Sequence, residues 1–251
     1  MENNSIAAIR VSGLSKSFDG QVVLNNVDLE VKRGETLTVL GRSGTGKSVL
    51  LKLIIGLLKP DRGKIEINGV EVTGLPLDKL NRVRKTVGFL FQQAALYDSL
   101  TVEENVAFPL RRHAEIGEDQ LRAQVTTLLA SVDMLDARTK LPADISGGMK
   151  KRVSLARALA LDPPIVLLDE PTTGLDPITA SEIIDLFREL RRHRRISSVM
   201  VTHDIHGVKG VSDRLAILNQ GNIVIDGTLD DLKKSRDPFV SRFMTGSGEV
   251  T

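Results

Sequence analysis

Short apolar runs with alternating polar positions open the sequence and predict β-strands. They lie at residues 8–11, 22–31 and 36–40. The last of these runs leads directly into a glycine-rich segment. From Lys47 the apolar residues follow helical spacing as far as Leu58, and Pro60 lies just past the predicted helix end. The pattern therefore predicts strands, then a glycine-rich loop, then a helix.

The middle of the chain changes to helical spacing. Asn68-Gly69 separates the apolar runs 64–67 and 70–72 and predicts a β-hairpin, and a buried strand is predicted at 86–91. The segment from about 94 to 160 is mainly helical. One amphipathic face in it is formed by Leu121, Val125, Leu128, Leu129 and Val132. We interpret this segment as a helical insertion.

The C-terminal third returns to an α/β alternation. Ile165 to Leu168 is a continuous apolar run, typical of a strand buried on both faces of a parallel sheet. Further elements are a helix at 178–192 and strands at 197–201, 213–218 and 222–226. Together they predict an α/β fold, with residues 246–251 as a flexible tail.

Composition restricts the class of protein. A chain of 251 residues with 41% hydrophobic residues can bury a sizeable core. Its longest apolar stretch, Val49 to Leu58, is far shorter than the roughly 20 residues that span a bilayer, and residues 1–8 lack the pattern of a secretory signal. The absence of cysteine excludes disulfides and thiolate metal sites. A net charge of +2 gives no argument for nucleic acid as a partner.

The glycine-rich segment matches the phosphate-loop pattern G-x-x-x-x-G-K-S between a predicted strand and a predicted helix. Its residues are Gly41, Arg42, Ser43, Gly44, Thr45, Gly46, Lys47 and Ser48. Glycines allow backbone amides to surround phosphate oxygens, and the following helix directs its positive end toward them. Lys47 is expected to contact the phosphates, and the Ser48 hydroxyl to ligate Mg²⁺. The segment predicts a site for ATP and Mg²⁺.

Two carboxylates follow the buried run of residues 165–168. Asp169 is expected to hold Mg²⁺ directly or through water, and Glu170 to accept a proton from the attacking water as a catalytic base. Alone, such a pair is equally typical of an ordinary strand end. Together with the phosphate loop it indicates nucleotide hydrolysis.

Ile145-Ser146-Gly147-Gly148-Met149 resembles the signature Leu-Ser-Gly-Gly-Gln of the ATP-binding cassette (ABC) family. Ser146 can cap a helix starting at Gly147, and the two glycines leave backbone amides open to a phosphate, although such a start more often serves capping alone. The resemblance implies the fold of an ABC-type P-loop ATPase: a RecA-like α/β core, an antiparallel β-subdomain and an inserted helical subdomain. It implies a single nucleotide-binding domain over residues 6–245.

Other elements of the family pattern occur in the family's order. The resemblance implies that Phe18 stacks on adenine and that Gln92 reaches Mg²⁺ and the attacking water. Asp176, in Gly174-Leu175-Asp176, matches a loop through which two protomers sense each other, and His203 matches a histidine that contacts the γ-phosphate. Without the family pattern, Phe18 would be a core residue, Gln92 an ordinary loop residue and His203 a structural histidine.

The resemblance also implies partners. In the family, the signature of one copy covers the γ-phosphate bound by a second copy, so a head-to-tail homodimer with two ATP is expected. Integral membrane permease subunits are the other expected partners. They place the chain peripherally at the cytoplasmic face of the bacterial inner membrane.

Three stretches resemble the ATPase of Mla/Mce-type systems, which move phospholipids or other lipids between bacterial membranes. They are residues 46–52, 91–102 and 146–149. Met149 stands where most cassettes have Gln. This resemblance implies an Mce-domain substrate-binding partner and leaves a STAS-domain partner open. The alternatives are an ABC motor for amino acids or lipoprotein export, and a non-transport ABC ATPase acting on nucleic acid or ribosomes. The low net charge and the single cassette disfavour nucleic acid as a partner.

Overall fold

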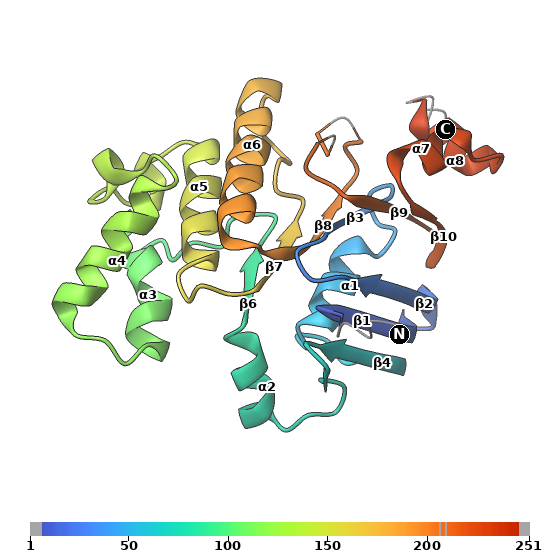
Figure 1. Ribbon diagram of the computed structural model, residues 1–251, viewed down its shortest axis with the longest axis horizontal. Coiled ribbons are helices and arrows are strands. Elements are labelled where there is room, and N and C mark those ends of the chain that lie inside the picture. Colours follow the sequence, from blue (N-terminus) through green and yellow to red (C-terminus); the bar gives the residue numbers. More distant parts are fainter. Residues whose placement is uncertain (1–6, 206, 209, 246–251) are drawn as a thin grey trace, which may run out of the picture. The chain divides into compact units, whose positions relative to one another are not determined.

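The computed structural model describes residues 7–205, 207–208 and 210–245, so residue 6 and the predicted tail 246–251 lie outside the described residues. The chain forms two compact units. The first unit combines Met1–Leu80 with Ser197–Thr251, and the second unit is Asn81–Ile196. Figure 1 shows the first unit in blue and red and the second unit in green to orange.

One sheet of the first unit is antiparallel, with strand order β2-β1-β4-β5. Its strands are β1 (Ile9–Phe18), β2 (Gln21–Val31), β4 (Arg62–Ile67) and β5 (Val70–Glu71). Ile67 pairs with Val70 across a two-residue turn in which Asn68 and Gly69 have φ of 50° and 78°. Two successive positive φ angles are what a type I′ hairpin turn requires, so the predicted hairpin is confirmed.

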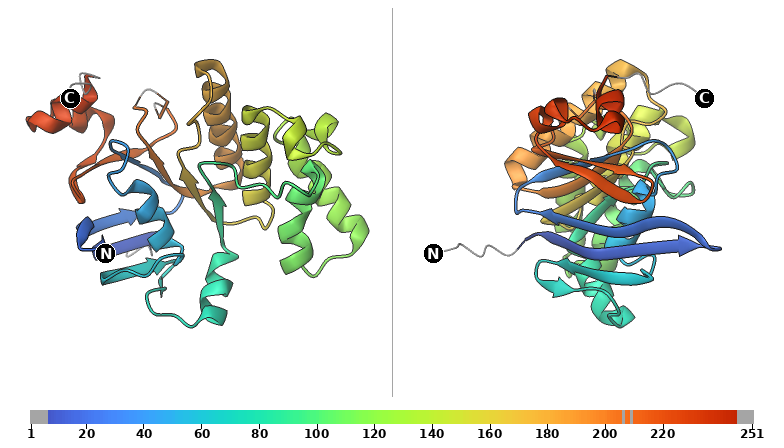
Figure 2. Two further views of the ribbon diagram at one scale, coloured as in Figure 1. Left: turned by 180° about the vertical axis from the view of Figure 1, so that it is seen from behind. Right: turned by 90° about the vertical axis from the view of Figure 1, so that its right-hand side faces the viewer.

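The first unit contains a second group of paired strands. They are β3 (Thr36–Leu40), β8 (Ser197–Thr202), β9 (Arg214–Asn219) and β10 (Asn222–Gly227). β3 lies between β8 and β9 and is parallel to both, while β10 pairs antiparallel with β9. All five residues of β3 are buried, as expected for a central parallel strand. The main-chain amide of Asn25 donates to the Gly221 carbonyl at 2.8 Å, and Figure 2 shows β2 beside the β9–β10 hairpin.

Helix α1 (Lys47–Ile54) packs against β8 and is shorter than the apolar pattern predicts. Gly56 has φ of 69°, and the Leu57 amide donates back to the Lys52 carbonyl at 2.8 Å. This left-handed glycine ends the helix in the way that glycine commonly does. The prediction that the helix continues to Leu58 is therefore wrong, because the last apolar residues belong to a turn.

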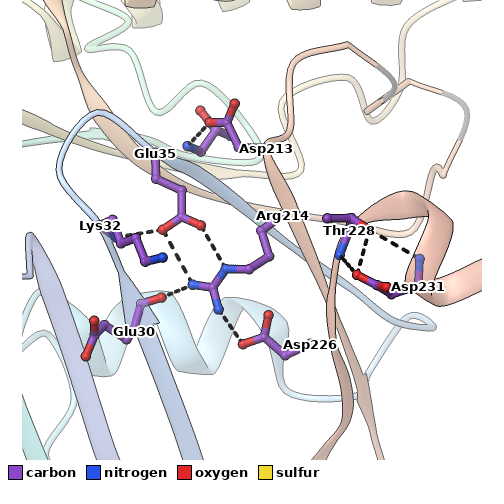
Figure 3. Close-up of polar contacts among 9 residues, drawn as sticks. Glu30, Lys32, Glu35, Asp213, Arg214, Asp226, Thr228 and Asp231 are labelled. Atoms are coloured by element: carbon purple, nitrogen blue, oxygen red, sulfur yellow. Dashed lines mark hydrogen bonds and ion pairs between the residues drawn. The ribbon is translucent and has the colours of Figure 1, made fainter.

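Arg214 joins several strands of the first unit (Figure 3). Its guanidinium donates to Glu35 Oε1 at 2.8 Å, to Asp226 Oδ2 at 2.7 Å and to the Glu30 carbonyl. Burial raises the pKa of Asp226 in spite of the adjacent Arg214. Two short helices that the sequence pattern did not predict, α7 (Leu229–Lys234) and α8 (Pro238–Met244), follow β10.

The second unit contains one pair of parallel strands and several helices. β6 (Val87–Leu90) pairs with β7 (Ile165–Asp169). The helices are α3 (Val102–His113), α4 (Glu118–Ala130), α5 (Gly147–Ala158) and α6 (Pro177–Arg194). α3, α4 and α5 pack on one another, and α5 also packs against β6 and α6. Short 3-10 turns lie at Leu135–Ala137 and Pro142–Asp144, and α2 (Leu77–Arg84), also unpredicted, contains the boundary between the units.

Within the described ranges, none of the helices combines the length and the apolar character needed to cross a membrane.

Candidate functional site

Two candidate segments in the first unit follow neighbouring strand ends. Leu40, the last residue of β3, pairs with Thr202, the last residue of β8. Gly41 begins the phosphate loop and His203 follows β8, so both start at the same edge of the sheet. His203 is exposed there. Ligands of parallel α/β sheets bind at this carboxyl edge.

The glycines of the phosphate loop are required by its geometry. A Cβ on Gly41 would lie 2.6 Å from the Leu218 carbonyl oxygen. Gly46, the N-cap of α1, has φ of 99°, and a Cβ there would lie 2.9 Å from the Val23 side chain. Gly46 has no side chain that could cap the helix. The backbone amides in the first turn of α1 therefore face the loop without a side-chain cap.

Lys47 lies inside this loop. Its side chain is only 5% exposed, and its ammonium donates to the carbonyls of Gly41 and Arg42 at 2.9 and 3.0 Å. The Thr45 hydroxyl also donates to the Arg42 carbonyl, at 2.9 Å. A buried cation at a helix N-terminus fits a polyphosphate, and the adjacent Ser48 hydroxyl is an oxygen donor of the kind that Mg²⁺ prefers. The chemistry of the loop thus fits both ATP and Mg²⁺.

Phe18 lies at the end of β1 with 40% of its surface exposed. The Lys16 ammonium lies 5.2 Å from the ring centroid and pairs with Asp61 at 2.8 Å. The alternative that Phe18 is a core residue is therefore wrong. The ring offers an accessible aromatic surface in the first unit.

The second unit brings Gln92 and the two carboxylates to one edge. Leu90 of β6 pairs with Leu168 of β7, so Phe91-Gln92 and Asp169-Glu170 lie at the carboxyl ends of neighbouring parallel strands. Asp169 is 4% exposed and Glu170 is 6% exposed. The Gln92 side chain is exposed.

Glu170 has an unusual backbone and a fixed side chain. Its φ of 45° lies in the left-handed region, which non-glycine residues adopt at a cost and which is common at functional sites. The Thr173 hydroxyl donates to Glu170 Oε2 at 3.0 Å. The carboxylate orientation is therefore set by a neighbouring side chain.

Lys151 of α5 is a site residue that sequence reasoning missed. Its ammonium donates to the carbonyls of Gln92 at 2.5 Å and Glu170 at 3.2 Å. Burial lowers the pKa of Lys151 to about 8, an effect that the charges of Asp169 and Glu170 partly offset. Lys151 stands in a run of three basic residues, which ordinarily indicates a solvated helix face. Its helical spacing from the buried residues Gly148 and Leu155 was the signal that could have revealed it.

The signature segment starts α5. Ser146 is the N-cap, and its Oγ accepts from the Met149 amide at 3.2 Å. A Cβ on Gly148 would lie 2.5 Å from Thr179, whereas a Cβ on Gly147 would meet only Leu175 at 3.5 Å. Gly148 is therefore required for packing against α6, while Gly147 is exposed and not required by any close contact.

Asp176 is the N-cap of α6. Its Oδ1 accepts from the amides of Ile178 at 3.1 Å and Thr179 at 3.0 Å. Hydrogen bonds from Thr179, and then from Ile178, lower the pKa of Asp176. The contacts of Gly147 with Leu175 and of Gly148 with Thr179 bring the signature segment and the Asp176 loop together.

A glycine-rich loop around a buried lysine, and a strand pair that ends in carboxylates, define the class of P-loop ATPases. The sequence profile of the ABC transporter family matches residues 24–173. The chain belongs to this family, and it is the ATP-binding and ATP-hydrolysing subunit type of such transporters.

Curated relatives carry different transport descriptions. The chain is 37% identical over 241 residues to the intermembrane phospholipid transport system ATP-binding protein MlaF of Haemophilus influenzae, covering 96% of this chain and 91% of that protein. It is 40% identical to the probable ribonucleotide transport ATP-binding protein mkl of Mycobacterium tuberculosis, covering 95% and 67%. It is 41% identical to the methionine import ATP-binding protein MetN of Rhodopseudomonas palustris, covering 90% and 62%.

Solved structures support the fold. The ATP-binding cassette MJ0796, described as a dimer in a post-hydrolysis state with ADP and Pi, aligns with a TM-score of 0.82 and 32% identity. The alignment covers 88% of this chain and 98% of that one. The predicted ABC-type α/β fold is confirmed.

Proposed function

We propose that this protein is the ATP-hydrolysing motor of a transporter that moves phospholipid or other lipid between bacterial membranes. Both units together form one nucleotide-binding domain over residues 6–245, with the helical insertion at about 94–160. Two copies act head to tail at the cytoplasmic face of the inner membrane, with permease subunits as partners. The relation to MlaF and the Met149 signature support the lipid assignment.

The proposed roles divide between the units. In the first, the phosphate loop and Lys47 bind the phosphates, Phe18 stacks on adenine and His203 contacts the γ-phosphate. In the second, Glu170 accepts a proton from the attacking water. Three oxygen donors would hold Mg²⁺, which when bound neutralises phosphate charge. They are Ser48, Gln92 and Asp169.

The signature of the second copy closes the site. Its Ser146, Gly147 and Gly148 contact the γ-phosphate bound by the first copy, and Asp176 lies in the loop that links the two sites. The dimeric state described for MJ0796 supports this arrangement.

The placement of Glu170 supports the hydrolytic role. Its side chain is almost fully buried and is oriented by Thr173, and it lies at the same edge of the strand pair as Gln92. Glu170→Gln removes the base and retains the shape. Loss of a general base costs roughly 10²–10⁴ in rate, so this variant is expected to bind ATP and dimerise but hardly to hydrolyse it. Light scattering with ATP and phosphate release measure the two properties.

Ser146→Arg in the Glu170→Gln background is the matched control. It adds bulk and charge to the proposed contact with the second copy, so ATP-dependent dimers should disappear while ATP binding to the monomer persists. Near wild-type hydrolysis by Glu170→Gln would remove Glu170 from its role. A Glu170→Gln protein that stays monomeric with ATP would contradict the paired site.

An aromatic groove in the second unit supports a permease partner. It has a volume of about 430 Å³ and is lined by Phe89, Phe91, Tyr97, Phe108, Lys85 and Arg157, among others. The Tyr97 and Phe108 rings lie 4.7 Å apart and are 47% and 42% exposed. Exposed aromatic residues beside basic ones suit a short helix with apolar residues and an acidic residue.

Replacing both aromatic residues tests this surface. Tyr97→Ser with Phe108→Ser should abolish co-purification with the permease and leave the ATPase activity of the isolated protein within about twofold of wild type, since neither residue has a proposed role in hydrolysis. Leu135→Ser, at another exposed apolar position, is the control. Undiminished permease binding would exclude the groove as the docking site.

An amino-acid importer motor is the second candidate, favoured by the identity to MetN. The two functions separate in proteoliposomes that hold the chain with its permease. A lipid system should show ATPase stimulation by an Mce-domain protein and ATP-dependent phospholipid transfer, whereas an importer should respond to a soluble amino-acid-binding protein. Co-purification of a STAS-domain protein would test the remaining proposed partner.

A further inference from the structure

Three polar side chains on one side of α5 bind the loop that follows β6. We name Lys151, Ser154 and Arg157 the donor row. The Lys151 ammonium donates to the Gln92 carbonyl at 2.5 Å, and the Ser154 hydroxyl donates to the Ala94 carbonyl at 2.9 Å. The Arg157 guanidinium donates to Ala94 and Ala95 at 2.8 and 2.7 Å. Residues three apart share one side of a helix, so the row follows the loop residue by residue.

The carbonyls that the donor row binds belong mainly to residues with unfavourable backbone angles. Ala94, Ala95 and Glu170 have φ of 60°, 48° and 45°, in the region that favours glycine. Lys151 also donates to the Glu170 carbonyl, at 3.2 Å. Residues in such conformations persist only where their surroundings fix them. The donor row supplies these fixing contacts at both places.

Lys151 occupies the central position in this arrangement. It is 4% exposed, and it joins the loop after β6 to the residue after β7. An ammonium has three donors and no acceptor, so one lysine can bind both carbonyls at once. The backbones of Gln92 and Glu170 are thereby fixed to the same helix, which begins at the signature serine.

We propose that Lys151 is a positioning residue for ATP hydrolysis, which sets the backbones of Gln92 and Glu170 so that their side chains meet the attacking water correctly. This inference rests on the proposed catalytic roles of Gln92 and Glu170. It extends them to a residue that acts through the backbone carbonyls of Gln92 and Glu170. Through Lys151, the helix that carries the signature is hydrogen-bonded to both catalytic segments within the second unit.

Lys151→Met tests the inference because it retains the apolar stem and removes the donors. Small misplacements of catalytic groups cost up to about 10²-fold, so kcat should fall about 10- to 100-fold. The ATP dissociation constant should stay within about twofold, because the phosphate loop belongs to the other unit. Lys151→Arg should recover most of kcat, since a guanidinium can donate to both carbonyls. Lys150→Met, one position earlier and directed about 100° away, should retain wild-type kcat.

A merely structural role predicts another pattern: a lower melting temperature with kcat per folded protein unchanged, and this result would overturn the proposal. So would an arginine variant as slow as the methionine variant at equal folded content. If Lys151→Met does not fold, Lys151→Gln replaces it, because its amide can reach one carbonyl. A kcat between those of wild type and Glu170→Gln then supports the proposal, and wild-type kcat overturns it.

Measuring Glu170→Gln in the same assays distinguishes failure of the positioning inference from failure of the proposed role of Glu170. If Glu170→Gln stalls and Lys151→Met turns over normally, only the positioning inference is lost. If Glu170→Gln itself turns over normally, the proposed role of Glu170 fails and the positioning inference falls with it.

Discussion

The two units fix their candidate residues by different means. In the first unit, close packing of the glycine backbone adds to the hydrogen bonds of Lys47 and Thr45: Gly41 lies against the Leu218 carbonyl, and Gly46 against Val23. In the second unit, Gln92 and Glu170 are held by side-chain donors, chiefly Lys151 and Thr173. Backbone packing without room for a Cβ permits one shape only. Each side-chain hydrogen bond depends on one donor residue, so a single substitution can release a catalytic segment of the second unit.

Among the substitutions that test this comparison, the largest effect is expected at Lys47, the buried cation of the phosphate loop. Charge-assisted hydrogen bonds are worth about 1.5–3 kcal/mol, so Lys47→Ala should weaken ATP binding about 10- to 100-fold. Calorimetric titration with ATP measures this. Lys52→Ala, on the same helix, should bind like wild type. Equal affinity of wild type and Lys47→Ala would contradict the phosphate-loop assignment.

Much of the fold follows from the spacing of hydrophobic residues and from the turn residues between them. β3 (Thr36–Leu40) has the predicted bounds, and the hairpin around Asn68-Gly69 was identified from its turn residues. α2 (Leu77–Arg84) was missed because it is short and its apolar residues are few: Leu77, Leu80 and Val83, none of which is buried. The strand order was not predicted either, since pairs such as β3 with β8 join residues about 160 positions apart in sequence.

The candidate site was predictable where chemistry requires a fixed local pattern. Gly41 to Ser48 form such a pattern, since each residue acts through its neighbours in sequence. Lys151 acts on carbonyls 59 and 19 residues away. Its helical spacing from Gly148 and Leu155 could indicate that it is buried, but no local pattern indicates which carbonyls it binds. The requirement for Gly148 is likewise visible only from its packing against Thr179.

Effects of intermediate size are expected when one glycine of each unit, Gly41 and Gly147, is replaced by alanine. Gly41→Ala places a Cβ 2.6 Å from a carbonyl oxygen, and overpacking of this kind typically costs about 1–3 kcal/mol. Gly147→Ala meets Leu175 at 3.5 Å, an ordinary contact, so its stability should change by less than about 0.5 kcal/mol. Urea unfolding followed by circular dichroism suits a chain without tryptophan.

Gly147→Ala, the variant with the smaller expected effect on stability, should have a clear effect in the dimerisation assay. In the Glu170→Gln background, Gly147→Ala should weaken ATP-dependent pairing, because its methyl covers an amide proposed to face the other copy's phosphate. Should Gly41→Ala prove as stable as Gly147→Ala, backbone packing would not be what fixes the phosphate loop.

The smallest effects concern one carboxylate in each unit, with opposite dependence on pH. Hydrogen bonds from Arg138 lower the pKa of Glu103, at 2.9 and 2.6 Å. Its stabilising contribution is present above the unfolded pKa and is lost as pH falls through the folded pKa. Burial raises the pKa of Asp226. Its contribution is present below the unfolded pKa and is lost as pH rises through the folded pKa.

Replacing each carboxylate by its neutral amide should therefore change the pH dependence of stability in opposite directions. Relative to wild type, Glu103→Gln should lose stability as pH rises from 3 to 7, and Asp226→Asn should gain it. Both carboxylates are partly solvated, so solvent screening limits each change to within about 1 kcal/mol. Asp98→Asn, at an exposed position, corrects for the general loss of a negative charge. Urea unfolding at several pH values gives the two slopes. Slopes of the same sign would mean that net charge, rather than local burial and pairing, sets the acid response of both units.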